Sequence, residues 1–168
     1  DPFEFMRLGT ALERAGLTAR ILDLKHHSVG PTDENVELPA ETAQWLATLR
    51  FCSGIEPFLK RQEHSLSGRS VVHFLLLDPA FPRSVLHNLE RARNFLELVR
   101  PPGRADLRSA RLLSATLEEV RGSTVDEVLA EGLHEVLTRV VEATTQIGDA
   151  IRLDFFDTAP ATAAVGEA

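Results

Sequence analysis

Apolar residues that alternate at steps of three and four near the start of the chain most constrain its fold. Between residues 5 and 27 these residues are Phe5, Leu8, Leu12, Ala15, Ala19 and Leu22. Such spacing keeps the side chains on one side of an α-helix, because each residue turns the chain by about 100°. A helix with one apolar seam packs against other helices, so this segment predicts a multi-helix fold.

A second line of residues runs beside that seam on the same helix. Its members are glycines and charged residues: Gly9, Glu13, Gly16, Arg20, Asp23 and His27. Charged residues that border an apolar seam are usually partly covered, and covered charges need partners. Glycines let another backbone or a ligand approach closely. We therefore expect Glu13 and Arg20 to face other helices rather than bulk water, and the line to form a candidate site.

Helical spacing recurs along the rest of the chain, without a convincing run of strand-like alternation. The apolar seams fall within residues 41–63, 67–77, 79–99, 107–122 and 123–156. Gly54 with Pro57 predicts a break in the first of these segments, and Gly132 a division of the last. The sequence predicts an all-α fold, a helical bundle of about five to seven helices. Residues 1–157 are expected to form a single domain and residues 158–168 a flexible tail.

Composition is that of an ordinary globular protein. The chain has 168 residues, of which 43% are hydrophobic and 26% charged. A net charge of −7 argues against a nucleic-acid-binding protein, which normally carries a basic patch. No apolar run approaches the ~20 residues that span a bilayer. The single cysteine, Cys52, rules out an internal disulfide and fits a reducing compartment, so the predicted localisation is cytoplasmic.

No motif identifies a reaction. The sequence lacks a glycine-rich phosphate loop, a pair of cysteines and the usual histidine spacings of zinc sites, so we predict no metal and no cofactor. Cys52 lies among Leu49, Phe51 and Ile55, which favours a small core residue over a nucleophile.

The charged line on the first helix is the stronger candidate. Arg20 and Asp23 are three residues apart, and Asp23 and His27 are four apart, so both pairs can touch along a helix. An arginine held by carboxylates is a natural receiver for a carboxylate or a phosphate. The alternative is that these charges form salt bridges between helices and fix the register of the bundle.

Arg83 is a second candidate for binding. It follows Pro82 near the start of a predicted helix, where the helix dipole disfavours a cation. A positive charge in that position suggests an acidic partner or ligand. The alternative is a surface arginine that reaches Asp78.

Several segments of this chain resemble segments of a known family, and they occur in the same order. They are RLG at 7–9, LERA at 12–15, TARILDLKHH at 18–27, FLLLDPAFPRSV at 74–85, GLHEVL at 132–137 and IGDAIRLDFF at 147–156. Together they resemble the alpha-E domain, a bacterial helical domain named for its helices and a recurring Glu-Arg motif. On this resemblance the motif corresponds to Glu13 and Arg14, and a Pro-Arg-Ser motif to residues 82–84.

The resemblance implies a functional context rather than a reaction. Alpha-E domains are associated with circularly permuted ATP-grasp ligases, transglutaminase-like proteins and, in some clusters, a proteasome-like hydrolase. Such company suggests the making or tagging of peptides through amide bonds. Family members are usually longer, and this chain resembles their C-terminal half, so we expect exposed apolar surface and a homodimer.

Three hypotheses follow. The leading one is a non-catalytic partner domain of an ATP-grasp-type amide or peptide ligase, which binds the enzyme or its acidic peptide substrate through Glu13, Arg14, Arg20, Asp23 and Arg83. The second is an enzyme that acts on a peptide or amide, with Glu13 and His27 as acid-base candidates. The third is a purely structural assembly module.

Overall fold

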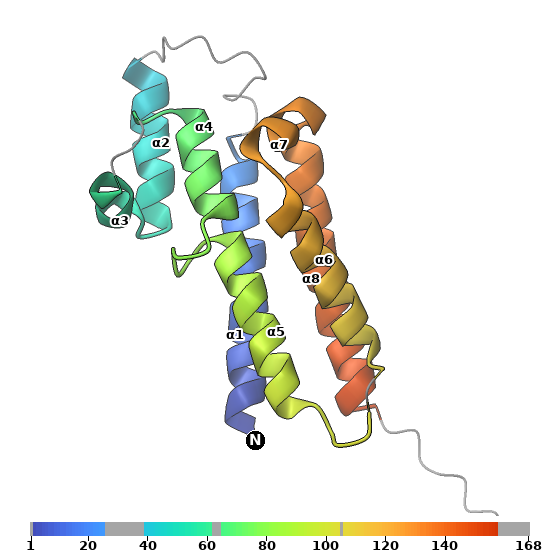
Figure 1. Cartoon of the computed structure of the whole chain (residues 1–168). Helices are drawn as coiled ribbons and strands as arrows, with labels where there is room; N and C mark the ends of the chain where they lie inside the picture. The colour runs from blue at the N-terminus through green and yellow to red at the C-terminus, as the bar shows by residue number, and fades with distance from the viewer. Residues whose placement is uncertain (1, 26–38, 62–64, 105, 158–168) are drawn as a thin grey trace, which may run out of the picture.

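Four long helices form the body of the molecule. The computed structural model describes residues 2–25, 39–61, 65–104 and 106–157. The long helices are α1 (Pro2–Asp23), α5 (Val85–Val99), α6 (Arg108–Gly122) and α8 (Leu133–Phe155). α1 and α6 each pack against both α5 and α8. Their directions alternate along the chain (Figure 1), so they make an up-down-up-down four-helix bundle.

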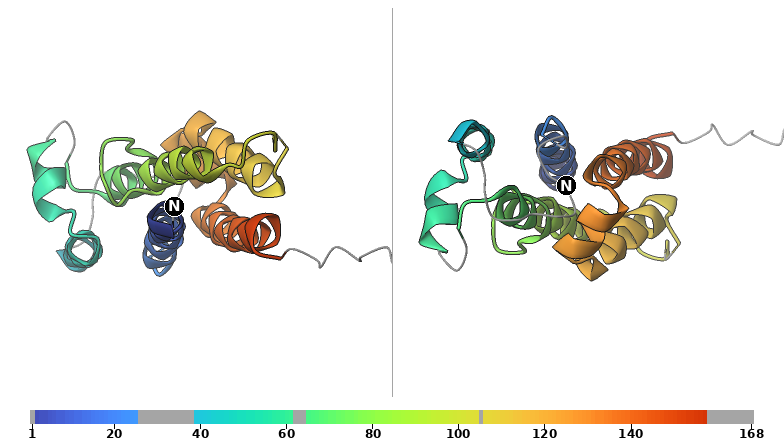
Figure 2. Two further views of the ribbon diagram at one scale, coloured as in Figure 1. Left: turned by 90° about the horizontal axis from the view of Figure 1, so that it is seen from below. Right: turned by 90° about the horizontal axis from the view of Figure 1, so that it is seen from above.

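Shorter helices fill the connections between the long ones. They are α2 (Pro39–Phe51), α3 (Ile55–Lys60), α4 (Gly68–Val72), its π-helical continuation η2 (His73–Leu77), and α7 (Val125–Glu131). In Figure 1, α4 lies end to end with α5. Figure 2 shows two layers, with α2, α1 and α8 in one layer and α4, α5 and α6 in the other. α1 is therefore the middle helix of its layer.

The core lies where the predicted seams meet. On α1 the buried seam residues are Leu8, Leu12, Ala15, Ala19 and Leu22. They pack with seam residues of the other long helices, namely Leu89, Ala92, Leu96, Leu113, Leu117, Leu137, Val140 and Ile147. The described residues contain helices and no strand, which confirms the all-α prediction.

The helices are more numerous than predicted because both of the predicted interruptions, at Gly54 and Gly132, separate distinct helices. The described residues form eight α-helices, compared with the about five to seven expected from the sequence. Gly54 separates α2 from α3, and its amide donates to the Leu49 carbonyl at 2.7 Å. Gly132 separates α7 from α8 with a φ of +119°, a left-handed conformation that favours glycine. Both interruptions stand where the sequence predicts them.

The first helix is shorter than the sequence predicts. α1 ends at Asp23 rather than near His27. His27, the predicted loop after it and the predicted tail lie outside the described residues.

Cys52 is only 2% exposed, which confirms it as a core residue. Burial raises the pKa of its thiol to about 11, against a smaller opposing effect of the Arg83 charge. Among the described helices, none is long and apolar enough to cross a bilayer.

Candidate functional site

A groove runs between α1 and α8, and the predicted charged line borders it. The groove encloses about 320 Å³. Its lining comes from both helices and is made mainly of small and charged residues: Gly9, Leu12, Glu13, Gly16, Arg20, Thr144, Thr145, Gly148 and Asp149. The structure therefore brings four residues of the predicted line to a single surface, which α8 completes.

The glycines of this groove have two different roles. A Cβ atom on Gly16 would lie 3.1 Å from the hydroxyl oxygen of Thr144, so the absence of a side chain allows the close approach of α1 and α8 there. Gly9 and Gly148 differ, because a Cβ atom on either would meet nothing within 4 Å. These two glycines leave the groove open.

Glu13 and Arg20 are left without partners in the bundle. Both border the groove, but both side chains are exposed, so the expectation that neighbouring helices cover them is wrong. The physical reason is that α8 lines this groove with Thr144, Thr145, Gly148 and Asp149, which leave it open rather than cover the two charges. Within the described residues neither Glu13 nor Arg20 forms an ion pair or a side-chain hydrogen bond. These two charges therefore do not fix the helix register.

Contacts between α1 and α8 bound the groove at its two ends. At one end the Oδ1 atom of Asp23 lies 2.7 Å from Nδ1 of His134. This hydrogen bond, together with the charge of Asp23, raises the pKa of His134 above its ordinary value. At the other end the ring of Phe5 packs against Phe155 and Phe156, with centroids 5.1 and 5.2 Å away. Asp23 thus has a partner on another helix, and the predicted pairing with His27 lies outside the described residues.

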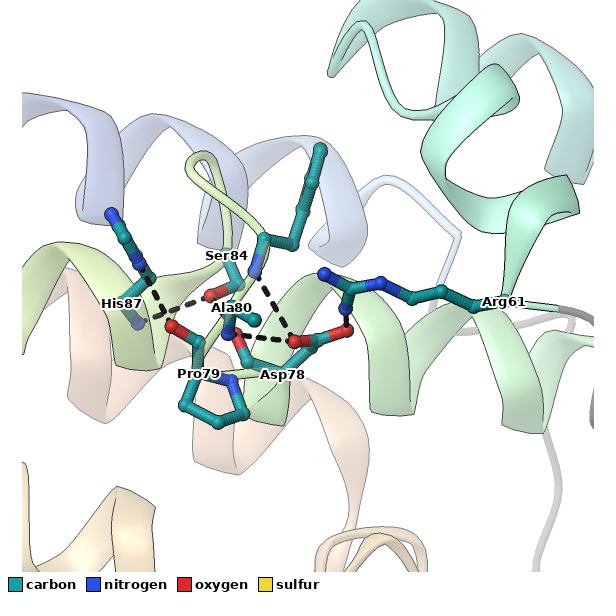
Figure 3. A network of polar contacts seen from close by, with 7 residues as sticks. Arg61, Asp78, Pro79, Ala80, Ser84 and His87 are labelled. Carbon is teal, nitrogen blue, oxygen red and sulfur yellow. Dashed lines mark hydrogen bonds and ion pairs between the residues drawn. The ribbon is translucent and has the colours of Figure 1, made fainter.

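The second candidate, Arg83, belongs to the turn between η2 and α5. Figure 3 shows how Asp78 organises this turn. Its Oδ1 atom accepts hydrogen bonds from the amides of Ala80 and Phe81, at 2.8 and 3.2 Å, and its carboxylate pairs with Arg61. The suggested contact between Arg83 and Asp78 is therefore replaced by one with Arg61 of the segment after α3.

Ser84, the serine of the Pro-Arg-Ser motif, is structural. It is fully buried and is the N-cap of α5, because its hydroxyl accepts from the His87 amide at 3.1 Å. The same hydroxyl donates to the Asp78 carbonyl, and His87 Nδ1 lies 2.8 Å from the Pro79 carbonyl (Figure 3). Asn88 donates to the carbonyl of Pro82 at 3.0 Å. These bonds fix the turn, so the motif needs no ligand to explain it.

The predicted arginines do not converge. The hydroxyl of Thr18 donates to the Arg83 carbonyl at 2.8 Å, and Thr18 lies about 160° around α1 from Arg20. The backbone of Arg83 is thus on the far side of α1 from the groove. Arg14 follows Glu13 directly, so its side chain points about 100° away from that of Glu13. Glu13, Arg20 and Asp23 share the α8 side, and Arg14 and Arg83 do not.

Sequence reasoning missed the half of the groove that α8 supplies. Thr144, Thr145, Gly148 and Asp149 follow one another at helical spacing beside the seam residue Ile147. Small and polar residues at this spacing resemble the glycine line of α1, which is the signal that would have identified them. His134 could not be paired with Asp23 in this way, because 111 residues separate the two.

Comparisons with known proteins, together with a search for metal-binding clusters, bear on the identity of this chain. Among the described residues, no three His, Cys, Asp or Glu side chains are close enough to hold a metal ion together. No curated protein and no solved structure matches the chain. A family model does match, over residues 1–156, and it is described as a predicted alpha-helical domain with a conserved ER motif. Because this model covers residues 1–156 of the 168, the chain belongs to the Alpha-E family.

Proposed function

We propose that this domain is a non-catalytic binding partner in an ATP-grasp-type ligase system, and that the groove between α1 and α8 is its docking surface. One observation carries the proposal: the groove presents Glu13 and Arg20, both exposed and both without an ion pair among the described residues. Opposite charges that the bundle leaves unpaired are available to a partner. The space beside Gly9 and Gly148, which line the same groove, is open.

The charges of the groove favour the ligase itself over an acidic peptide. Arg20 offers five N–H donors, which suit a carboxylate bound through two parallel hydrogen bonds. Two carboxylates, those of Glu13 and Asp149, lie in the same groove and would repel a strongly acidic chain. A folded partner that presents a carboxylate to Arg20 and a cation or N–H group to Glu13 meets both requirements.

The identity of the partner rests on the family resemblance. The association of alpha-E domains with ATP-grasp ligases supports the ligase as the primary partner, and their association with transglutaminase-like proteins and a proteasome-like hydrolase supports those as further partners. A soluble complex of this kind forms in the cytoplasm of a bacterium. The proposed docking surface is therefore argued from the groove, and the proposed partner from the family resemblance.

An enzymatic role fits the groove less well. General acid-base catalysis needs a proton-transferring group within hydrogen-bond reach of the substrate, in a site that limits water. Glu13 is exposed in an open groove, and the histidine at the groove's end, His134, is bound to Asp23. His27, the other acid-base candidate, lies outside the described residues. Recognition makes fewer demands on this geometry than catalysis does.

Filling the groove tests the proposal. The ligase is co-purified with the full-length protein from its native host, and its affinity for purified variants is then measured by calorimetry. Gly9→Leu and Gly148→Leu place side chains in open space at the groove, so the helices stay intact while the partner is blocked. Gly122→Leu is the matched control, because Gly122 is also a helical glycine with nothing within 4 Å of a Cβ, but outside the groove.

A weakening of about tenfold or more, which corresponds to about 1.4 kcal/mol, is expected for both groove variants and not for the control. Arg20→Ala is expected to weaken binding in the same way, whereas Arg14→Ala, on the same helix but away from the groove, is not. Equal affinity for all variants would exclude the groove as the docking surface. Turnover of a peptide or amide by the isolated domain, abolished by Glu13→Gln, would make this protein an enzyme instead.

A further inference from the structure

α1 carries a second seam on the side that faces away from the core. Residues at alternating steps of three and four lie along this outward face: Phe3, Met6, Thr10, Glu13, Leu17, Arg20 and Leu24. Met6, Leu17 and Leu24 are 60%, 55% and 78% exposed. α1 is the middle helix of its layer (Figure 2), so this outward seam runs along the centre of an exposed face. We name it the outer seam.

The spacing of the outer seam is that of a helix-pairing surface. Side chains repeating every three and four residues line up along one helix and fit between those of a second helix. Apolar side chains exposed singly on a protein surface need no explanation, but a line of them at this spacing is typical of an interaction site. Two charged residues interrupt the apolar side chains of the outer seam. Glu13 and Arg20 carry opposite charges, and neither has a partner among the described residues.

We propose that a second copy of this chain covers the outer seam, with the two α1 helices antiparallel about a two-fold axis that passes between residues 16 and 17. Glu13 and Arg20 are equally far from that point along the helix. In such a pair Glu13 therefore faces Arg20 of the second copy, and Arg20 faces its Glu13. One symmetry axis thus neutralises all four charges that the two separate bundles leave unpaired.

Side-chain sizes agree with the same register. Leu24 faces Gly9 of the second copy, whereas Gly16 is buried against α8 and takes no part in this pairing. The space beside Gly9 is open, so it would receive a leucine side chain without moving its neighbours. A large side chain opposite an exposed glycine lets two helix backbones approach closely.

The charges also exclude the parallel alternative. A parallel two-fold pair sets each residue opposite its own copy, so Glu13 would face Glu13 and Arg20 would face Arg20. Like charges held together in an interface cost free energy and act against that arrangement. The outer seam therefore specifies an orientation as well as a partner.

The dimer and the ligase would share the α1 surface. The second copy would cover the mouth of the groove beside Glu13 and Arg20, so ligase binding is expected to weaken as the concentration of this protein rises. Only this consequence rests on the proposed function. Self-association itself is measured with no ligase present, so failure of one proposal leaves the other standing.

Charge reversal combined with mixing tests the dimer. Light scattering of the full chain at micromolar concentration is expected to give twice the 18.5 kDa of one chain. Glu13→Arg alone and Arg20→Glu alone each create two like-charge pairs across the axis, so each variant is expected to be monomeric. An equimolar mixture of the two variants restores both attractive pairs and is expected to form a heterodimer. The double variant, with the charges exchanged within one chain, is expected to dimerise as well.

Glu56→Arg on α3 is the matched control, because Glu56 is exposed and far from the outer seam, and this variant is expected to remain a dimer. Circular dichroism of each variant checks that the helices remain folded. A wild-type mass of 18.5 kDa at micromolar concentration would overturn the proposal. So would a dimer that survives both single reversals, or a mixture of the two folded variants that stays monomeric.

Discussion

The tetrapeptide LERA occurs at residues 12–15 in α1 and again at residues 89–92 in α5. Its apolar half behaves identically in the two helices. Leu12 and Ala15 are buried in the bundle core, and so are Leu89 and Ala92. In both places the four residues form one turn of helix that directs its leucine and alanine inward.

The charged half of the tetrapeptide behaves differently in the two helices. Glu90 lies 2.8 Å from a guanidinium nitrogen of Arg121, which α6 brings alongside α5. Glu13 borders a groove that α8 lines with Thr144, Thr145, Gly148 and Asp149, and it forms no ion pair within the described residues. The same local sequence therefore fixes the buried face, and the neighbouring helix decides whether its glutamate stabilises the bundle or remains available to a partner.

The largest expected effect tests the shared apolar half. Leu12→Ala and Leu89→Ala each remove a buried side chain, so each is expected to lower the free energy of unfolding by about 2–5 kcal/mol. Urea denaturation of the purified protein measures this loss. Leu98→Ala is the control, since Leu98 is 68% exposed and its removal leaves no cavity. A small loss at Leu12 alone would show that the two segments differ in their cores too.

The next largest effect on stability distinguishes Gly16 from Gly9, the two glycines of α1 that line the groove. Gly16→Val forces a branched side chain against Thr144, so the free energy of unfolding is expected to fall by about 1–3 kcal/mol. Gly9→Ala enters open space in a helix, where alanine is favoured over glycine, so stability is expected to rise by about 0.5–1 kcal/mol. Thermal unfolding followed by circular dichroism measures both. Equal effects at the two positions would contradict the close approach of α1 and α8 at Gly16.

A smaller effect distinguishes the two glutamates. Glu90→Gln removes the ion pair with Arg121 and is expected to lower the melting temperature slightly, whereas Glu13→Gln is expected to leave it unchanged. Surface ion pairs are screened by salt, so the difference is expected to shrink in about 1 M NaCl. A melting temperature that falls with Glu13→Gln would place Glu13 in the bundle's own charge network.

The smallest effect concerns the end of the groove. The pKa of His134 is raised above 6.5 by its hydrogen bond to Asp23, so the folded state holds the proton more tightly than the unfolded state does. The pair therefore stabilises the fold at pH values below about 6.5, and this contribution is lost as the pH rises through the raised pKa. An NMR titration of the ring is expected to show the raised value, and Asp23→Asn to return it toward normal. An unshifted value in the wild type would contradict the contact.

Much of the fold could be predicted because its signals are local. The spacing of Leu8, Leu12 and Leu22 specifies a helix and its inward face without reference to any other segment. Gly54 and Gly132 interrupt helices through their own backbone preferences. The groove is different, because it depends on which helix lies beside α1, and nothing in residues 9–20 indicates that Thr144 and Gly148 will face them.

The charged contacts were the least predictable part. The sequence puts Asp23 within reach of Arg20 and His27 along its own helix, but it does not indicate that the carboxylate reaches His134 on α8. A contact between Asp78 and Arg83 was one of the two alternatives for Arg83, but the structure pairs Asp78 with Arg61. Helical spacing shows which charges lie on one line, whereas the choice between several cations follows from tertiary packing.

Ligase affinity tests most directly whether the two LERA glutamates, Glu13 and Glu90, have separate roles. Calorimetry with the ATP-grasp ligase is done on wild type, Glu13→Gln and Glu90→Gln at a protein concentration low enough to keep the chain monomeric. A hydrogen bond to a charged group is worth about 1.5–3 kcal/mol, so Glu13→Gln is expected to weaken binding by about tenfold or more. Glu90→Gln is expected to bind as wild type does. Unchanged affinity for Glu13→Gln, or an equal loss for both variants, would contradict the account.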